Sequence, residues 1–257
     1  LAVDSQERFY LASKNASTGR FDLLQIGTDG AVQTIADLGV TRVNGVGVNS
    51  RDEVFVGAPN NLIKVDPVTG AVSTFTTVGL PNPRNIAIDG KDNVYVQNES
   101  DVISMIKPDR SSVLLYSKGD GVVDPSFEGD GYPNIAADCA DNFYIAPYRW
   151  DVIKQNGEEH ILAQVVPRTG QVSALFDGLK ISSHLSDIDY LSFDRFGSRI
   201  LMWADYVNEI WQVPVTCGAI SVEAHLVAQP GQDLSGFSRP PSAIIPLVDG
   251  RTEYVFS

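Results

Sequence analysis

Basic residues, histidine and cysteine are scarce in this chain of 257 residues. It has 19 Lys and Arg against 32 Asp and Glu, a formal net charge of −13, with three His and two Cys. That charge repels phosphate backbones and anionic membrane surfaces, so the composition argues against a nucleic acid partner. Long apolar runs are also missing: no stretch approaches the roughly 18 to 20 apolar residues that span a bilayer. We therefore expect no membrane insertion.

The sequence motifs of common catalytic sites are missing too. The chain contains no G-x-S-x-G, P-loop or H-E-x-x-H sequence. The histidines are His160, His184 and His225, and only His184 stands just before an expected inner strand. They do not form a catalytic set, which favours a binding protein over an enzyme.

The ends and the modification motifs bear on location. No basic segment followed by an apolar one stands at the start, and the first residue is Leu1 rather than Met, so we interpret the chain as a processed or trimmed piece. Two cysteines and two N-x-[ST] tripeptides, at Asn15 and Asn98, fit an exported protein, either bacterial or a eukaryotic glycoprotein. The expected location is secreted, periplasmic or at the cell surface.

What the sequence does contain is a repeat. Six times an apolar run ends in Asp or Asn, a polar turn follows, and a second apolar or aromatic run comes next. The closing polar residues are Asp4, Asn49, Asp89, Asp138, Asp194 and Asp249. Short strands repeating every 40 to 56 residues predict a β-propeller, because one unit cannot bury its own apolar faces. We expect the closing residues to be structural and to accept hydrogen bonds from the N–H groups of the tight turns.

The first five copies are each followed by a hairpin. In the second copy Asp66-Pro67-Val68-Thr69-Gly70 supplies the turn between two alternating strands, so each complete repeat holds four strands. No hairpin follows the sixth strand pair, which ends at Ser257. The sequence therefore predicts a single all-β domain over 1–257, a six-bladed β-propeller of four-stranded antiparallel blades with an incomplete sixth blade. Either two outer strands are missing beyond Ser257 or before Leu1, or the sixth blade is narrow and its open edge pairs with a partner.

The inner strands that end in Asp, the D-G or D-N turns and the "VYV" or "FYI" second strands resemble the six-bladed propellers of the NHL-repeat and gluconolactonase-like superfamily. The resemblance covers essentially the whole chain as a fold pattern. Streptogramin lyase propellers are similar in the same way, but their chemistry relies on histidines at the channel mouth that this sequence does not supply. WD repeats are disfavoured, since no Gly-His and Trp-Asp pair recurs.

In such a propeller the loops between second and third strands share one face with the blade-to-blade crossings. We call it the crossing face and the opposite one the turn face. The resemblance to gluconolactonase-like hydrolases implies a divalent cation held there by polar residues before the inner strands, here Asn44, Asn85, Asn134 and Asp189. The family's early Glu ligand has no match, and three amides with one carboxylate bind a hard cation weakly. The alternative is that these side chains cap backbone groups.

Two other features of the crossing face are candidates for binding. The longest crossing, 118–133, carries Asp120, Asp124, Glu128 and Asp130, which makes it either a Ca²⁺ site or a solvated acidic loop. Residues of types that anchor interfaces or stack on sugars gather in two further loops. We expect them to contact a protein subunit of a larger assembly or a glycan, the alternative being burial between blades: Tyr148, Arg149, Trp150, Asp205 and Tyr206.

The two cysteines, Cys139 and Cys217, are expected on the turn face of neighbouring blades. A disulfide between them is a candidate, but inner and outer turns are commonly farther apart than the roughly 7 Å that a disulfide allows between Cα atoms. The function that the sequence favours is an exported propeller acting as a binding or scaffold subunit through the crossing-face loops. The alternative is a metal-dependent, lactonase-like hydrolase with a cation at the channel mouth.

Overall fold

All of the regular secondary structure in the described part of the chain consists of β-strands. The computed structural model describes residues 2–77, 80–98, 102–117, 134–137, 143–146, 148–149, 159–165, 172–177, 188–194, 199–204, 209–216, 219–220, 225–228, 243–246 and 252–255. It divides into two compact units, Leu1–Leu114 and Leu115–Ser257. Within the described residues no helix is long and apolar enough to cross a membrane. The single domain over 1–257 stays a prediction.

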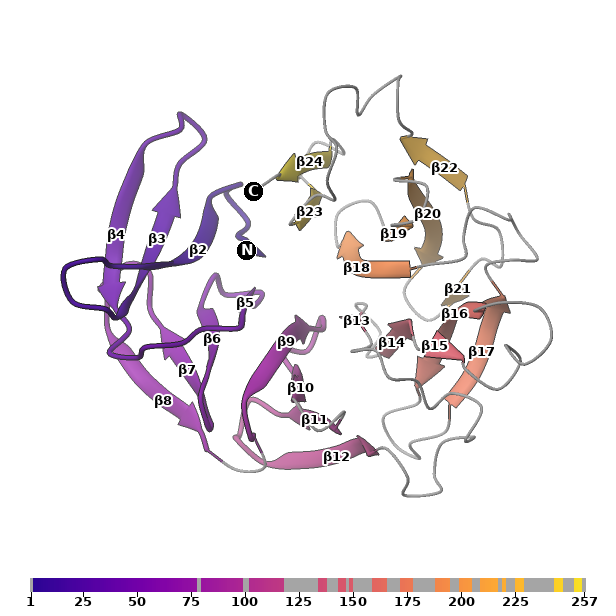
Figure 1. Ribbon diagram of the computed structural model, residues 1–257, viewed down its shortest axis with the longest axis horizontal. Helices are drawn as coiled ribbons and strands as arrows, with labels where there is room; N and C mark the ends of the chain where they lie inside the picture. Colours follow the sequence, from indigo (N-terminus) through magenta and orange to yellow (C-terminus); the bar gives the residue numbers. More distant parts are fainter. Residues whose placement is uncertain are drawn as a thin grey trace. The chain divides into compact units, whose positions relative to one another are not determined.

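The first unit contains three four-stranded antiparallel sheets, each with its strands in chain order (Figure 1). The first sheet consists of β1 (Ala2–Val3), β2 (Phe9–Lys14), β3 (Phe21–Ile26) and β4 (Val32–Asp37). The second consists of β5 (Gly45–Val48), β6 (Val54–Ala58), β7 (Asn61–Val65) and β8 (Val72–Thr76). The third consists of β9 (Pro83–Ile88), β10 (Val94–Asn98), β11 (Val102–Ile106) and β12 (Ser112–Ser117), the last of which crosses the boundary between the units.

The second unit holds two sheets of five described strands and one of two. The fourth sheet comprises β13 (Asn134–Ala137), β14 (Phe143–Ala146), β15 (Tyr148–Arg149), β16 (Glu159–Val165) and β17 (Val172–Asp177). The fifth comprises β18 (Ile188–Asp194), β19 (Arg199–Ala204), β20 (Glu209–Thr216), β21 (Ala219–Ile220) and β22 (His225–Ala228). The sixth comprises β23 (Ala243–Pro246) and β24 (Thr252–Val255). Six successive sheets, the last with two strands among the described residues, match the predicted blades.

The second strand of a sheet is apolar on both faces because it faces two cores. All five residues of β6 are buried. Val54 and Val56 pack with Tyr10 and Leu23 of the first sheet. Phe55 packs in the next cluster, among residues of the third sheet, and meets the Phe75 ring edge-on at a centroid distance of 5.1 Å. Side chains alternate between the two faces of a strand, so one strand contributes to both inter-sheet cores.

A buried carboxylate closes the inner strand of the first sheet. The Oδ1 atom of Asp4 accepts hydrogen bonds from the backbone N–H of Gln6 at 2.8 Å and of Arg8 at 3.0 Å. Its Oδ2 atom accepts from the Arg8 Nε at 2.6 Å and from the Tyr10 hydroxyl at 2.9 Å. Asp4 is fully buried, and these donors satisfy both of its oxygens.

The third sheet repeats this arrangement at the same spacing. Asp89 Oδ1 accepts from the N–H groups of Lys91 and Asn93, both at 2.9 Å. Its Oδ2 accepts from the Asn93 Nδ2 at 2.8 Å and from the Tyr95 hydroxyl at 2.9 Å. The prediction that the closing residues are structural is confirmed in the described repeats.

The second sheet has an amide in place of the carboxylate, and its surroundings change to match. Asn49 Oδ1 still accepts from the N–H groups of Arg51 and Glu53, at 3.0 and 2.9 Å. Its Nδ2 now donates to Glu53 Oε2 at 2.7 Å, and the residue six positions on is Phe55, which has no hydroxyl. Lys64 Nζ binds the other Glu53 oxygen at 2.7 Å. Donors surround the carboxylates and an acceptor meets the amide, so each variant satisfies its own hydrogen-bonding groups.

Successive sheets are linked at these turns. The Asp52 carboxylate of the second sheet accepts from the backbone N–H and the hydroxyl of Ser5 in the first, at 2.9 and 2.6 Å. The Asp92 carboxylate of the third sheet accepts from the backbone N–H of Ser50 at 2.9 Å. Asp52 and Asp92 both have positive φ, 61° and 63°, a conformation that Asp adopts more readily than most residues. The acidic residue three positions after Asn49, and the one three positions after Asp89, thus connect their sheets to the preceding ones.

We predict that Asp89→Ala lowers the free energy of unfolding by roughly 3 kcal/mol. The substitution removes the acceptor of two turn N–H groups and of the buried Tyr95 hydroxyl. Chemical denaturation measures the loss. Asp109→Ala is the control, since Asp109 is exposed and accepts hydrogen bonds only from Ser111 of its own turn. Comparable losses in the two variants would contradict the structural role of the closing residues.

The second sheet supplies the design of a double-mutant cycle in the first. Asp4→Asn and Tyr10→Phe together recreate the Asn49 and Phe55 pair. We expect the double variant to be more stable than the sum of the two single losses allows, with a coupling energy of about 1 to 2 kcal/mol. Denaturation of the four proteins measures it. Additive losses would show that the Tyr10 hydroxyl and the Asp4 carboxylate do not depend on one another.

Burial, reinforced by the hydrogen bond to Asp4, raises the pKa of Tyr10 to about 12. Below pH 10 the folded and unfolded chains both keep this proton, so the stabilisation is fully present. Between pH 10 and 12 the unfolded chain loses the proton while the folded chain retains it, so stability falls as pH rises, by roughly 2 kcal/mol from this group. Denaturation across this range should show a shallower fall for Tyr10→Phe than for the wild type. Parallel curves would contradict the prediction.

Candidate functional site

The crossing face of the first unit is built around a close approach of β5 to β9. A Cβ atom on Gly45 would lie 2.7 Å from the Arg84 carbonyl oxygen, and one on Gly47 would lie 2.8 Å from the Ile86 side chain. Only glycine allows this separation. Because Gly45 lies by Arg84 and Ile86 while Gly47 lies by Ile86 and Ile88, the two strands run in the same direction and their first residues are adjacent. Figure 1 shows β5 beside β9.

Asn44, immediately before β5, joins the two strands at this point. Its backbone N–H donates to the Gly57 carbonyl at 3.1 Å, and its Nδ2 donates to the Pro83 carbonyl of β9 at 2.9 Å. Its Oδ1 accepts from the Arg42 Nε at 3.0 Å. Asn44 therefore caps backbone groups, as the alternative interpretation of the sequence proposed, and it also orients an exposed guanidinium group.

Asn85 and Gln97 form a second amide pair. They face one another across β9 and β10, and the Asn85 Nδ2 donates to the Gln97 Oε1 at 2.8 Å. Gln97 is fully buried, and its Nε2 has no hydrogen-bond partner. The Oδ1 of Asn61, at the start of β7 on the same face, is also buried and unsatisfied. Leaving such a buried atom without a hydrogen bond costs about 1 to 3 kcal/mol, so each of these two groups calls for an explanation.

The four residues predicted to hold a metal do not form a ring of equivalent positions. Asn85 and Asn134 each stand four residues before their closing Asp and pair with Gln97 and Ala146. The equivalent residue of the second sheet is Gly45, paired with Gly57, so Asn44 is displaced by one residue. Asp189 lies in β18 where the pairing with β19 is irregular. A displacement of one residue in a strand turns the side chain to the other face.

Electrostatics also argue against Asn44 as a cation ligand. A divalent ion at ligand distance from its Oδ1 would lie within about 5 Å of the Arg42 guanidinium, a repulsion of roughly 6 kcal/mol at an effective dielectric constant of 20. Among the residues that the structure describes, no three His, Cys, Asp or Glu side chains lie close enough to hold a metal ion. The metal site stays a prediction.

Other predicted residues fall partly outside the described chain. Tyr148 and Arg149 form β15, whose backbone pairs with His160 and Glu159 of β16. The remaining members lie outside the described residues: Trp150, Asp205, Tyr206, Cys139, Cys217 and the acidic crossing 118–133. The contact surface, the disulfide and the Ca²⁺ site therefore stay predictions.

The two glycosylation tripeptides differ in their structural setting. Asn98 is 3% exposed, and its Oδ1 accepts the Val102 N–H at 3.1 Å, so a glycan on its Nδ2 is incompatible with this packing. Asn15 is half-buried in the loop after β2. Its Oδ1 accepts from the Ser17 N–H and hydroxyl, and its Nδ2 donates to Asp22 at 2.9 Å. Of the two, Asn15 is the one at an exposed turn.

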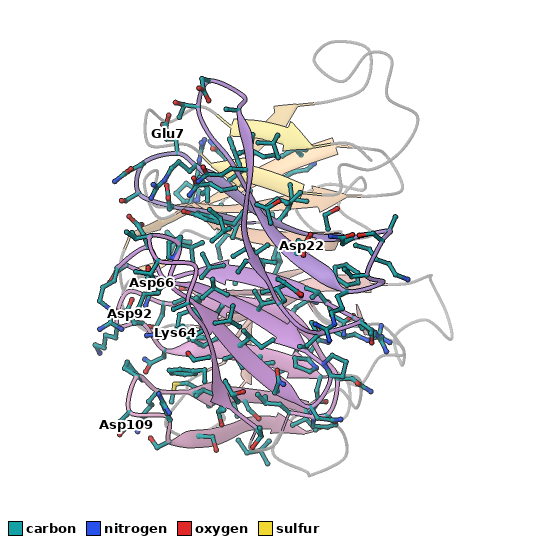
Figure 2. All side chains as sticks on the ribbon, turned by 90° about the vertical axis from the view of Figure 1, so that its left-hand side faces the viewer. Glu7, Asp22, Lys64, Asp66, Asp92 and Asp109 are labelled. Carbon is teal, nitrogen blue, oxygen red and sulfur yellow. The ribbon has the colours of Figure 1, made fainter. Side chains whose placement is uncertain are left out.

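The turn face of the first unit is rich in carboxylates. Figure 2 shows Glu7, Asp66, Asp92 and Asp109 along one edge together with Lys64, whereas Asp22 lies away from that edge. Arg51 lies 3.0 Å from Glu53 and 3.6 Å from Asp92. Although partial burial opposes ionisation, hydrogen bonds from Lys64 and Asn49 lower the pKa of the Glu53 carboxyl.

Sequence reasoning missed Gln97, Asn61, Arg42 and Arg84. For Gln97 a signal was present: it stands eight residues after its closing Asp, where the neighbouring repeats have small or apolar residues. Those residues are Ala12, Gly57, Ala146, Met202 and Ser257. A long polar side chain at a position otherwise occupied by small or apolar residues marks a departure from the structural pattern. Asn61 and the two arginines carry no comparable signal.

Comparison with known proteins identifies the fold. No family model and no curated protein matches the sequence. The structure is similar to a chain of a nidogen–laminin complex, with a TM-score of 0.61 and 15% identity over 93% of this chain and 82% of that one. It is also similar to a streptogramin B lyase, with a TM-score of 0.61 and 11% identity over 98% of this chain and 74% of the lyase.

A third similar structure is a protein of unknown function from Bacteroides thetaiotaomicron. The TM-score is 0.56 at 17% identity over 78% of this chain, which spans 55% of that protein. At these identities the likeness shows the fold alone. Together with the repeated sheets, it confirms the predicted all-β propeller.

Proposed function

We propose that this β-propeller is an exported binding or scaffold subunit that contacts its partner through the crossing face. The observation that carries the proposal is the buried Gln97 Nε2, which has no partner, beside the Asn85 amide. On the turn face the buried Asp4, Asn49 and Asp89 have their oxygens occupied by turn N–H groups and side chains. Unsatisfied polar groups therefore concentrate on the face that the sequence predicts for binding.

The chemistry of this face supports binding rather than catalysis. The described polar side chains at the starts of β5 and β9 are amides and guanidinium groups, which orient a ligand through hydrogen bonds but are poor nucleophiles and poor general bases. The similar structures include a chain from a protein complex and a lyase, so the fold is compatible with either class. The rival proposal is a lactonase-like hydrolase. It needs a set of cation ligands that does not include Asn44.

A second set of proposed contact residues lies in the second unit. Tyr148, Arg149, Trp150, Asp205 and Tyr206 are included because aromatic residues and Arg anchor interfaces, and because long loops on a rigid scaffold commonly carry contacts. The proposed partner is a protein subunit or a glycan. Ca²⁺ at 118–133 remains part of the proposal, as does a secreted, periplasmic or cell-surface location.

The test selects ligands for the whole chain from a phage-displayed dodecapeptide library and a glycan microarray. Gln97→Met should weaken the selected ligands at least tenfold, because it removes the amide while keeping the length of the side chain. Gln25→Met is the matched control: Gln25 is also buried, but it binds the Tyr10 hydroxyl at the turn-face end of β3. Thermal unfolding shows that both variants fold. Ligands that lose affinity equally in both variants, or in neither, would place the binding surface elsewhere.

A further inference from the structure

We infer that Asn15 carries an N-linked glycan and that Asn98 does not. The inference rests on the export that is part of the proposed function, and it goes beyond that function by assigning a covalent modification site. Both tripeptides, Asn15-Ala16-Ser17 and Asn98-Glu99-Ser100, have the same acceptor pattern. Their structural settings differ, and the difference decides which of them can hold a sugar in the folded chain.

The Asn15 tripeptide lies in the turn that joins β2 to β3. The Asn15 backbone N–H donates to the Arg20 carbonyl at 2.7 Å, and its carbonyl accepts from the Gly19 N–H at 2.8 Å. Gly19 has a φ of 71°, which glycine adopts readily, and a Cβ atom there would meet nothing within 4 Å. The residues on either side of Asn15 are exposed: Lys14, Ala16, Ser17 and Thr18. A group attached at this turn therefore extends into solvent.

The hydrogen bonds of the Asn15 side chain are compatible with an attached sugar. Its Oδ1 atom accepts from the Ser17 N–H at 3.0 Å and from the Ser17 hydroxyl at 2.6 Å. Its Nδ2 atom carries two hydrogens, and the contact with Asp22 Oδ2 at 2.9 Å uses one of them. A sugar replaces the other hydrogen. The modified amide still donates to Asp22, and Oδ1 is unchanged, so the turn keeps all three bonds.

The modification is a transfer of a sugar from phosphate to nitrogen. The donor is an oligosaccharide linked through its anomeric carbon to a lipid diphosphate. The Asn15 Nδ2 forms a bond to that carbon, the bond between the carbon and the diphosphate oxygen breaks, the lipid diphosphate leaves and Nδ2 releases one proton. No oxidant or reductant is required.

Asn98 has no room for the same group. It is the last residue of β10, where it pairs with Pro83 of β9, and it is 3% exposed. Its Oδ1 accepts from the N–H of Val102, the first residue of β11, at 3.1 Å. Protein interiors are close-packed, so a sugar ring on the Asn98 amide would have to push these strands apart. A chain modified at Asn98 cannot form the third sheet as the structure has it.

The Asn15 turn lies at the end of the first sheet that is remote from the Asp4 turn. β2 pairs with β1 through Phe9 and Tyr10 near the Asp4 turn and ends at Lys14, immediately before Asn15. Asp22, the hydrogen-bond partner of Asn15, lies away from the edge that carries Glu7 (Figure 2). A glycan on Asn15 therefore stands on the crossing face and limits how closely a partner approaches the first sheet there.

The test expresses the whole chain behind a cleavable secretion signal in cultured human cells. The intact mass of the secreted protein is measured before and after digestion with peptide N-glycosidase. Digestion in heavy-oxygen water converts a glycosylated Asn into a labelled Asp, so peptide mapping reports on Asn15 and Asn98 separately. We expect the label at Asn15 and none at Asn98.

Three variants separate the acceptor sites. Ser17→Ala should abolish the change in mass on digestion, whereas Ser17→Thr, which keeps a hydroxyl in the tripeptide, should retain it. Ser100→Ala is the matched control: it removes the other tripeptide in the same way and should leave the glycan in place. Thermal unfolding shows that the variants fold.

An unmodified Asn15 in the chain made by these cells, or a labelled Asp at position 98 in the secreted chain, would overturn the inference. The added signal exports the chain, so neither result depends on where the protein resides naturally. Failure of this inference is distinguishable from failure of the proposed function. A chain glycosylated at Asn15 whose selected ligands do not depend on Gln97 would keep the glycan site and remove the binding site, and an unmodified Asn15 with Gln97-dependent ligands would do the reverse.

Discussion

The buried polar residue that closes each inner strand is the interaction on which the described repeats depend. One carboxylate or amide satisfies two N–H groups of the turn that follows, and a partner six residues along reaches back to it where a tyrosine is present. The turn is thereby fixed, and the acidic residue within it lies where it can bind the preceding blade. Local turn chemistry and the spacing of neighbouring sheets are set by the same few atoms.

The same dependence explains why the repeats differ without losing the fold. Asp4 and Asp89 are each matched by a tyrosine hydroxyl and a donor four residues on, whereas Asn49 is matched by Glu53 and Phe55. A single exchange would leave a buried group unsatisfied, so the residues are expected to change together. The glycines of β5 have a structural role at the other end of the strand. Because they lack side chains, β9 can approach closely enough for the Pro83 carbonyl to accept a hydrogen bond from Asn44.

These two ends give the first unit faces of different chemistry. The turn face is rich in carboxylates, and its buried closing residues have their oxygens satisfied. At the starts of β5 and β9 on the crossing face, arginines stand beside the amides of Asn44 and Asn85, and the buried Gln97 Nε2 lacks an acceptor. Propellers similar to this one come from a protein complex and from a lyase, so the fold itself does not select between binding and catalysis. The side chains at the strand starts carry the functional argument.

Much of the fold was readable from the sequence because its determinants are local. The closing residues, the turns three positions later and the alternation of the strands recur at regular intervals, and each acts within a few residues of itself. The positions of Asn44, Asn85 and Gln97 were decided by tertiary structure. Asn44 resembles Asn85 in sequence but is offset by one residue in register, which sends its side chain to a different neighbour. Burial of Asn98 and the unsatisfied Gln97 Nε2 likewise depend on contacts between strands, which hydrogen bonds across the sheet set and a single repeat does not encode.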